Sequence, residues 1–208
     1  MRRNIKRRWA FLRVIAGKAK GKRLNAPRGM KTRPITDMIK EALFNVLGPG
    51  VYEAAFLDLF AGSGSVGIEA LSRGAHPVFF VDNDRAAIGV ILENIKNCGF
   101  SEGFRIFGHD VFHALRVLER NAVQFDYIYV DPPFNQESIF GKIMVALGPA
   151  RLLAPGGLVI LRTQRKMIMA DRYENLSRTR INQYGESILH YYHMDKEEKG
   201  NDGDISRS

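Results

Sequence analysis

The stretch FAGSGSVG, residues Phe60–Gly67, decides the fold that this chain can adopt. It directly follows the apolar run Ala54–Phe60 (AAFLDLF), and its glycines Gly62, Gly64 and Gly67 have the spacing G-x-G-x-x-G. Glycines at this spacing let a strand turn tightly into a helix and let the backbone approach a ligand closely. The motif alone is weak evidence, because a glycine-rich turn can be purely structural. It predicts a strand-loop-helix unit whose loop is a candidate ligand site.

The sequence around this unit alternates short apolar runs with segments of helix length. Near-continuous apolar strands separated by helices indicate a parallel sheet covered on both faces. The expected strands are Ala54–Phe60, Pro77–Asp82, Phe104–Asp110, Phe125–Asp131 and Gly157–Leu161, and the expected helices are Ile68–Ser72, Ala86–Asn97, Val111–Asn121 and Ile139–Leu147. Two final strands, Arg178–Gln183 and Ser187–His193, should form an antiparallel pair. We therefore expect a Rossmann-like α/β fold with a mostly parallel, seven-stranded sheet.

Size and composition limit the class of protein. A chain of 208 residues and 23.5 kDa fits one large domain better than two. Its hydrophobic fraction of 45% and charged fraction of 25% are those of a globular protein, which excludes disordered and fibrous classes. No apolar run approaches the ~20 residues that span a bilayer, and no secretory signal is evident. The single cysteine, Cys98, favours a reducing compartment without a cysteine-held metal, so we expect a cytoplasmic protein. Nothing in the sequence demands more than a monomer.

Positive charge is concentrated at the N-terminal end. Residues 1–40 hold 14 of the 31 lysines and arginines but only one acid, Asp37, a balance of +13, whereas the rest of the chain has a balance of −4. A basic N-terminal arm on a mildly acidic remainder is typical of a protein that binds phosphate groups through the arm. The alternative is a solvated arm that only improves solubility.

Two elements are expected within the arm. Residues 14–24 interleave apolar residues with glycines and lysines, a hairpin-like pattern that exposes the lysines. A helix should then begin after Thr36, which can cap it, and stop at Gly48-Pro49. Its apolar face consists of Ile39, Leu43, Val46 and Leu47.

Acidic residues mark the carboxyl ends of the expected strands. Asp58 lies in the first strand, Asp82 ends the second, and Asp110 and Asp131 end the third and fourth. Open α/β sheets bind ligands at this edge, where Asp82 could accept hydrogen bonds from both hydroxyls of a ribose. Four carboxylates would repel the pyrophosphate of a dinucleotide but suit S-adenosylmethionine, which carries a sulfonium and an ammonium. A single aspartate at such a position could equally be a helix cap.

The strongest chemical motif is Asp131-Pro132-Pro133-Phe134. The two prolines donate no backbone hydrogen bond and restrict the turn, which leaves it rigid and rich in acceptors. Such a turn can accept both hydrogens of an exocyclic base amine, on the Asp131 carboxylate and the Pro132 carbonyl, so that the nitrogen lone pair turns towards a methyl group. Phe134 could stack on the base. The alternative is a rigid structural loop with a buried phenylalanine.

Four segments resemble the bacterial RsmD family of small-subunit rRNA guanine-N2 methyltransferases. They are RVIAGKAKGKRL (Arg13–Leu24), TRPITDMIKEALFNVL (Thr32–Leu47), LDLFAGSGSVGIEALSRGA (Leu57–Ala75) and YVDPPF (Tyr129–Phe134). The resemblance extends from about Arg13 to Tyr192, and its TRP-x-TD motif is more specific than the glycine loop. It implies methylation by S-adenosylmethionine of the exocyclic amine of one guanine, usually numbered 966, in 16S rRNA, as naked RNA or in a small-subunit particle.

The resemblance also implies roles for individual residues. The catalytic loop would be Asp131, Pro132, Pro133 and Phe134. The methyl-donor site would comprise Phe60, Ala61, Gly62, Ser63, Gly64, Asp82, Asn83, Asp110 and Val111, to which the row of acids near the strand ends adds Asp58. Arg33, Thr36, Asp37 and Lys40 would lie beside the target base. The positive charge of the arm, independently of the resemblance, predicts that Arg13, Lys18, Lys20, Lys22 and Arg23 bind RNA phosphates.

We expect four regions: a basic flexible segment (1–12), a hairpin-helix RNA-binding extension (13–50), a methyltransferase domain (51–194) and a polar tail (195–208). The sequence departs from the family pattern at one place, because Arg162-Thr163 stands after the fifth strand where an acidic residue is frequent. The Met1–Trp9 extension lies outside the similarity, and we assign it no role.

Three other functions compete with this one. A DNA adenine-N6 methyltransferase also uses an acid-Pro-Pro-aromatic loop, although the TRP-x-TD motif argues against it. A nicotinamide-dependent dehydrogenase would explain the glycine loop and Asp82 but neither the DPPF motif nor the basic arm. A non-catalytic ribosome-assembly factor would explain the arm but would not need the four acids.

Overall fold

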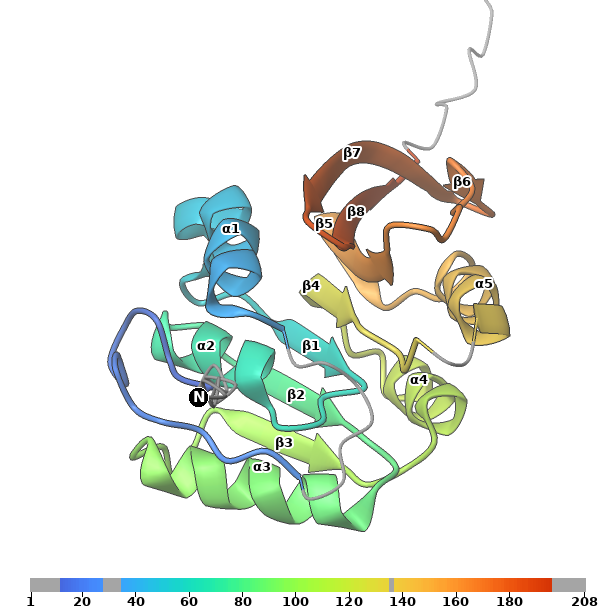
Figure 1. The fold of residues 1–208 in the computed structure, drawn as a ribbon. Coiled ribbons are helices and arrows are strands. Elements are labelled where there is room, and N and C mark those ends of the chain that lie inside the picture. The colour runs from blue at the N-terminus through green and yellow to red at the C-terminus, as the bar shows by residue number, and fades with distance from the viewer. Residues whose placement is uncertain (1–11, 28–34, 135–136, 196–208) are drawn as a thin grey trace, which may run out of the picture.

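The computed structural model describes residues 12–27, 35–134 and 137–195 (Figure 1). The expected segments 1–12 and 195–208 and the Met1–Trp9 extension thus lie outside the described residues, apart from Leu12 and Asp195. The helices are α1 (Asp37–Leu47), the 3-10 helix η1 (Gly48–Val51), α2 (Ser65–Ser72), α3 (Arg85–Asn97), α4 (Val111–Arg120) and α5 (Glu137–Leu147). The strands are β1 (Phe56–Leu59), β2 (Val78–Val81), β3 (Phe104–Phe107), β4 (Phe125–Val130), β5 (Leu153–Gln164), β6 (Arg172–Tyr173), β7 (Leu176–Tyr184) and β8 (Ser187–Met194).

The eight strands within the described residues form one sheet in the order β3-β2-β1-β4-β5-β8-β7-β6. The first five are parallel, and β8, β7 and β6 continue the sheet in antiparallel pairs, which confirms the mostly parallel Rossmann-like fold. The expected count of seven strands was one too low. The additional strand, β6, has two residues paired with Leu176 and Ser177, too few to produce a hydrophobic period in the sequence.

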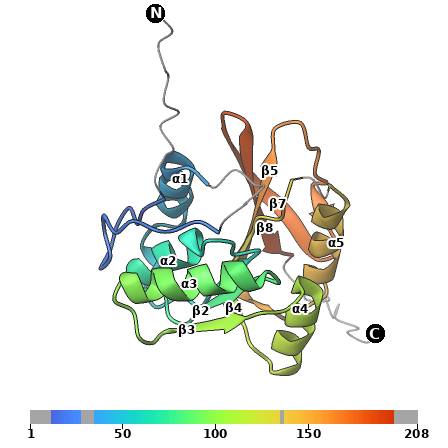
Figure 2. The ribbon, with the colours of Figure 1, turned by 60° about the horizontal axis from the view of Figure 1, so that its bottom comes forward.

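Two hydrophobic cores lie on the two faces of the sheet. Neighbouring residues of one strand alternate between them, so that Phe56 packs with α1, α2 and α3, whereas Leu57 packs with α4 and α5. Figure 2 shows these two helical layers on opposite sides of the strands. Because β3, β2, β1, β4 and β5 are parallel, their carboxyl ends form one edge of the sheet, at which a ligand site is expected.

Several boundaries differ from the expected ones for local reasons. The third strand ends at Phe107 instead of Asp110, because Asp110 caps α4 by accepting hydrogen bonds from the backbone N–H groups of Phe112 and His113. Helix α2 begins at Ser65, inside the glycine motif. A Cβ on Gly67 would lie 2.3 Å from the ring of Phe80, so the third glycine of the motif is required for α2 to pack on β2.

The arm has the hairpin-like shape predicted for it. The Val14 N–H donates to the Lys22 carbonyl (2.9 Å), the Leu24 N–H donates to the Leu12 carbonyl (2.8 Å), and Thr36 caps α1 by accepting from the Ile39 N–H (3.4 Å). Val14 and Leu24 are buried in the core that α1 and α2 share, which fastens the hairpin to the body. Within the described ranges, no helix is long and apolar enough to cross a membrane.

Candidate active site

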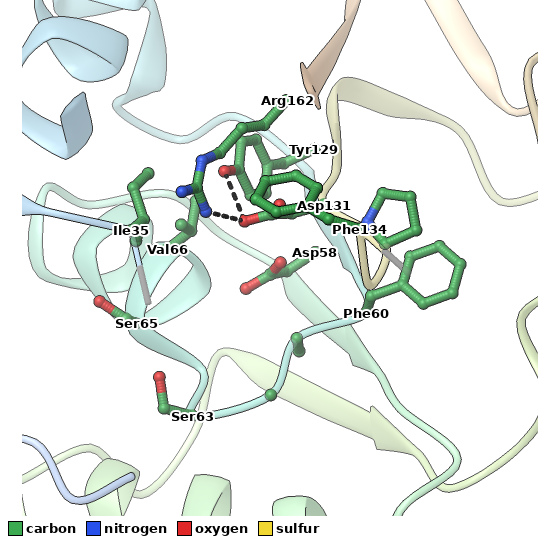
Figure 3. Close-up of a pocket in the computed structure, with 13 residues that line it drawn as sticks. Ile35, Asp58, Phe60, Ser63, Ser65, Val66, Tyr129, Asp131, Phe134 and Arg162 are labelled. Carbon is green, nitrogen blue, oxygen red and sulfur yellow. Dashed lines mark hydrogen bonds and ion pairs between the residues drawn. The ribbon is translucent and has the colours of Figure 1, made fainter. Parts of the chain in front are cut away.

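A pocket opens at the carboxyl ends of β1 and β4, where the glycine loop and the DPPF loop meet (Figure 3). The N-terminal end of α2 and the end of β5 complete its wall. Most of its lining was predicted from the sequence as donor-binding or catalytic residues. The lining residues are Ile35, Asp58, Phe60, Ala61, Gly62, Ser63, Ser65, Val66, Tyr129, Asp131, Pro132, Phe134 and Arg162.

The glycine loop is held in place by Asp82 at the end of β2. The Gly62 N–H donates to Oδ2 of Asp82 (2.8 Å), and the Asp84 N–H donates to Oδ1 (2.9 Å). Each carboxylate oxygen can accept a second hydrogen bond, so Asp82 keeps acceptor capacity for a hydroxyl-bearing ligand. Gly62 has a φ of 56°, a left-handed conformation that favours glycine and makes the tight turn into α2.

Asp58 is a buried acid on the floor of the pocket. Its side chain is 2% exposed, and its Oδ2 accepts a hydrogen bond from the Gly67 N–H (2.9 Å). Burial is the main cause that raises the pKa of Asp58 to about 8, and the neighbouring charges of Asp131 and Asp82 add to the effect. Near neutral pH this carboxyl therefore holds a proton until a positive charge approaches it.

Asp131 is held by two side chains that the sequence analysis had not placed in the site. The Tyr129 hydroxyl donates to Oδ2 of Asp131 (3.1 Å), and the Arg162 guanidinium donates to the same oxygen (2.8 Å). Both contacts are drawn as dashed lines in Figure 3. The Arg162 Cζ also lies 5.2 Å from the centre of the Phe134 ring, a cation–π distance. Arg162 thus contacts both candidate functional side chains of the DPPF loop, Asp131 and Phe134.

Burial and these charges affect the ionisation of both partners. Burial raises the pKa of Tyr129 well above its ordinary value, and the charge of Asp131 raises it further. Burial alone would lower the pKa of Arg162, but the nearby Asp131 outweighs it and raises that pKa. Arg162 and Tyr129 therefore keep their protons and stay hydrogen-bond donors. The sequence contains one signal that could have predicted the Arg162–Asp131 pair. An arginine stands inside the apolar run GLVILRT, and a buried guanidinium needs an acidic partner.

Other predicted site residues lie away from the pocket lining. Asp110 is exposed and caps α4, and Val111 is buried in the core beneath α4 and α5, so the four acids do not form one continuous rim. Asp58 and Asp131 line the pocket, and Asp82 holds the loop from outside the lining. Asn83 is exposed beside Asp82.

Lys40 requires a correction. It was expected beside the target base, but its side chain is only 1% exposed. Its Nζ donates to the Arg13 carbonyl (2.5 Å) and to Ser65 Oγ (3.1 Å), and it forms an ion pair with Glu69 (3.5 Å). Burial lowers the pKa of Lys40, although Glu69 opposes the effect. Lys40 therefore fastens α1 to α2 and to the hairpin, away from any solvent-borne phosphate.

The remaining predicted RNA contacts lie at the surface. Lys18, Lys20, Lys22 and Arg23 are exposed on the hairpin. Arg13 is exposed and pairs with Asp37 at the start of α1 (2.7 Å), next to the half-buried cap Thr36. Arg33 lies outside the described residues.

Comparisons with known proteins agree with this geometry. A family model described as "Conserved hypothetical protein 95" matches residues 12–193. The "Ribosomal RNA small subunit methyltransferase D" of Haemophilus influenzae is 33% identical to this chain over 74% of the chain and 79% of its own length. The chain belongs to the RsmD family.

Further RsmD-family similarity covers nearly the whole chain. A Bacillus subtilis protein named "Putative rRNA methyltransferase YlbH" is 34% identical over 84% of this chain and 94% of its own length. The solved structure of "Putative methyltransferase yhhF from Escherichia coli" superposes with a TM-score of 0.76 at 28% identity and covers 88% of this chain and 97% of that one. The similarity therefore includes both the pocket and the hairpin.

Proposed function

We propose that this RsmD-family protein transfers a methyl group from S-adenosylmethionine to the exocyclic N2 amine of a guanine in 16S rRNA, the base usually numbered 966. The observation that carries the proposal is the meeting of the glycine loop and the Asp131-Pro132-Pro133-Phe134 loop in one pocket. Family membership supports the coarser statement that the protein is an S-adenosylmethionine-dependent rRNA methyltransferase.

The pocket fits a positively charged methyl donor. Asp58 supplies a carboxyl group on its floor that can lose its proton as a cation approaches, and Asp82 stands behind the glycine loop with acceptor capacity for a ribose. When bound, S-adenosylmethionine supplies a methyl group activated by its sulfonium. A nicotinamide dinucleotide would instead bring two negative pyrophosphate charges towards these acids. These acceptor groups therefore support a methyltransferase over a dehydrogenase.

The DPPF loop suits an amine acceptor. An aromatic amine is a poor nucleophile because its lone pair is delocalised into the ring. The Asp131 carboxylate and the Pro132 carbonyl would accept its two hydrogens and so free the lone pair. Phe134 ends this loop, is half-buried and stacks on Phe140 (6.4 Å between ring centres). It would hold the base by stacking.

The basic hairpin would hold the RNA. Its lysines are exposed, whereas its backbone is fastened to α2 by hydrogen bonds from Ile15 and Ala16 to Glu69 and from Lys18 to the Ser72 carbonyl. Helix α2 also begins at the pocket. One helix thus connects the proposed RNA-binding surface with the proposed donor site.

The direct test is to incubate the protein with labelled S-adenosylmethionine and, in separate reactions, 16S rRNA, small-subunit particles or duplex DNA, and to map the modified nucleotide. We expect a single N2-methylguanine. Labelling of adenine N6 in DNA would identify the DNA enzyme instead, and RNA binding without methyl transfer would identify an assembly factor.

Two variants separate the proposed donor site from the proposed catalytic loop. Asp131→Asn should abolish transfer and leave donor affinity close to that of the wild type. Asp82→Ala should weaken donor binding by about 10- to 100-fold, because it removes a charged acceptor worth about 1.5–3 kcal/mol. Equal donor affinity in Asp82→Ala and wild type, measured by calorimetry, would show that the ribose binds elsewhere.

A further inference from the structure

Arg162 is a buried cation at the edge of the pocket with more contacts than an ion pair requires. It lies on β5, its side chain is 4% exposed, and its two terminal nitrogens donate to different elements. One donates to Asp131 after β4 (2.8 Å), and the other to the Ser187 hydroxyl on β8 (3.3 Å). The Arg162 Nε is buried and has no hydrogen-bond partner among the described residues. A buried guanidinium is costly unless it is well paired, so this placement needs an explanation.

The contacts of Arg162 make the two oxygens of Asp131 unequal. Arg162 and Tyr129 both donate to Oδ2, so the described side-chain donors to this carboxylate converge on one oxygen. The other oxygen, Oδ1, keeps its acceptor capacity for a group that enters the pocket. Two fixed donors on one oxygen also restrict rotation of the carboxylate about its last bond.

Arg162 acts on the second functional side chain of the loop as well. Its Cζ lies 5.2 Å from the centre of the Phe134 ring, whose own neighbour is Phe140. A planar guanidinium can contact an aromatic face and donate in its own plane at the same time, which an ammonium cannot do. The carboxylate and the ring are therefore oriented by one side chain.

We infer that Arg162 is a positioning residue for methyl transfer, which fixes Asp131 through Oδ2 so that Oδ1 accepts from the target amine, and fixes the Phe134 ring against which the base stacks. This inference rests on the proposed function and deepens it. Arg162 lines the pocket, but in this assignment its guanidinium donates to Asp131 and Ser187 and to neither the donor nor the amine. Its removal should therefore slow turnover without weakening the binding of either substrate.

The test compares Arg162→Met, Arg162→Lys and Tyr129→Phe in the full-length protein. We expect Arg162→Met to lower kcat by about 10- to 100-fold, the range that corresponds to one hydrogen bond to a charged group. The KM for 16S rRNA and the affinity for S-adenosylhomocysteine should stay within about twofold of the wild type. Arg162→Lys should recover part of the lost kcat, because it keeps the charge but not the planar fork. Tyr129→Phe should cost less than Arg162→Met, because it removes a neutral donor.

Arg178→Met is the matched control, because it also removes a largely buried arginine. Arg178 lies on β7, pairs with Asp171 and does not line the pocket, so its variant should lose stability with an unchanged kcat. A wild-type kcat in Arg162→Met, or a raised KM for RNA, would overturn the inference. A wild-type protein that methylates no RNA would instead overturn the proposed function.

Discussion

Asp58 should determine how the proposed donor site responds to pH. Its pKa of about 8 results mainly from burial, so a positively charged ligand bound near it must displace a proton. We expect the affinity for S-adenosylmethionine to rise with pH by up to about tenfold per unit and to level off above pH 8. S-adenosylhomocysteine lacks the sulfonium charge and is the matched control ligand.

Calorimetry from pH 6 to pH 9 checks this expectation. The ratio of the two affinities should increase with pH in the wild type and stay flat in Asp58→Asn, which retains an acceptor for the Gly67 N–H. A constant ratio in the wild type would mean that the sulfonium binds away from Asp58.

Single residues show where interpretation of the sequence succeeded and where it failed. The glycine loop and the DPPF motif were predictable because each occupies a few consecutive residues. The pair Arg162–Asp131 spans 31 positions, and the sequence analysis left the role of Arg162 open. Lys40 was wrongly expected beside the target base, a position that the resemblance implied, whereas its partner Glu69 stands on another helix. Partners brought together by tertiary folding leave no spacing signal.

At the scale of elements, Glu69 of α2 connects the hairpin to the body. It is fully buried, accepts from the N–H groups of Ile15 (2.7 Å) and Ala16 (3.0 Å), and pairs with Lys40 and Arg73. Glu69→Gln keeps the shape but leaves the Lys40 ammonium buried without its anion, which typically costs about 3–5 kcal/mol.

We therefore expect denaturant unfolding of Glu69→Gln to show a loss of about 3 kcal/mol, with faster hydrogen exchange at Ile15 and Ala16. Glu93→Gln is the matched control, because Glu93 also contacts the N-terminal segment, through Asn25, but is exposed. Equal losses in the two variants would contradict a special role for the buried network.

The hairpin itself supports a prediction about salt. Lys18, Lys20 and Lys22 are exposed along one short segment, so each phosphate contact that they make should release counterions. Replacing all three with alanine should weaken RNA binding and reduce the slope of log affinity against log salt by about 2, at roughly 0.7–0.9 per contact.

Lys142→Ala is the control for this experiment, because Lys142 is exposed on α5, on the opposite face of the sheet. Donor affinity should be unchanged in both variants. An unchanged salt slope in the triple variant would favour a hairpin that only improves solubility.

At the scale of the whole molecule, the apolar runs predicted the layered α/β architecture because buried parallel strands have a strong composition signal. The antiparallel end was predicted less completely. Strand β6 is too short to show a hydrophobic period in the sequence. Strand β5 runs from Leu153 to Gln164, beyond the expected Gly157–Leu161, because it pairs with both β4 and β8. The polar groups buried at this end were not predictable at all, because three strands supply them.

His190 makes the antiparallel end of the sheet sensitive to acid. It is 2% exposed on β8, its Nδ1 accepts from Arg178 on β7 (3.2 Å), and its Nε2 lies 2.9 Å from Thr163 Oγ1 on β5. Burial, together with the charge of Arg178, lowers the pKa of His190 to about 4 from its ordinary value of 6.5. Between these values the unfolded chain binds a proton that the folded chain does not, so the free energy of unfolding falls as pH falls.

The His190 contribution can be isolated by comparing variants across pH. Between pH 6.5 and pH 4, the His190 contribution should lower the free energy of unfolding of the wild type by up to about 3 kcal/mol. Asp58, whose pKa shifts upwards, changes the free energy of unfolding in the opposite direction. His190→Gln keeps a donor for Thr163 and cannot take up the proton, so the difference in unfolding free energy between wild type and variant should shrink steadily over this interval. The exposed His109, changed to Gln, serves as the control and should show a difference that varies little. If the His190→Gln difference were equally constant from pH 6.5 to pH 4, the histidine would have to be protonated within the folded sheet.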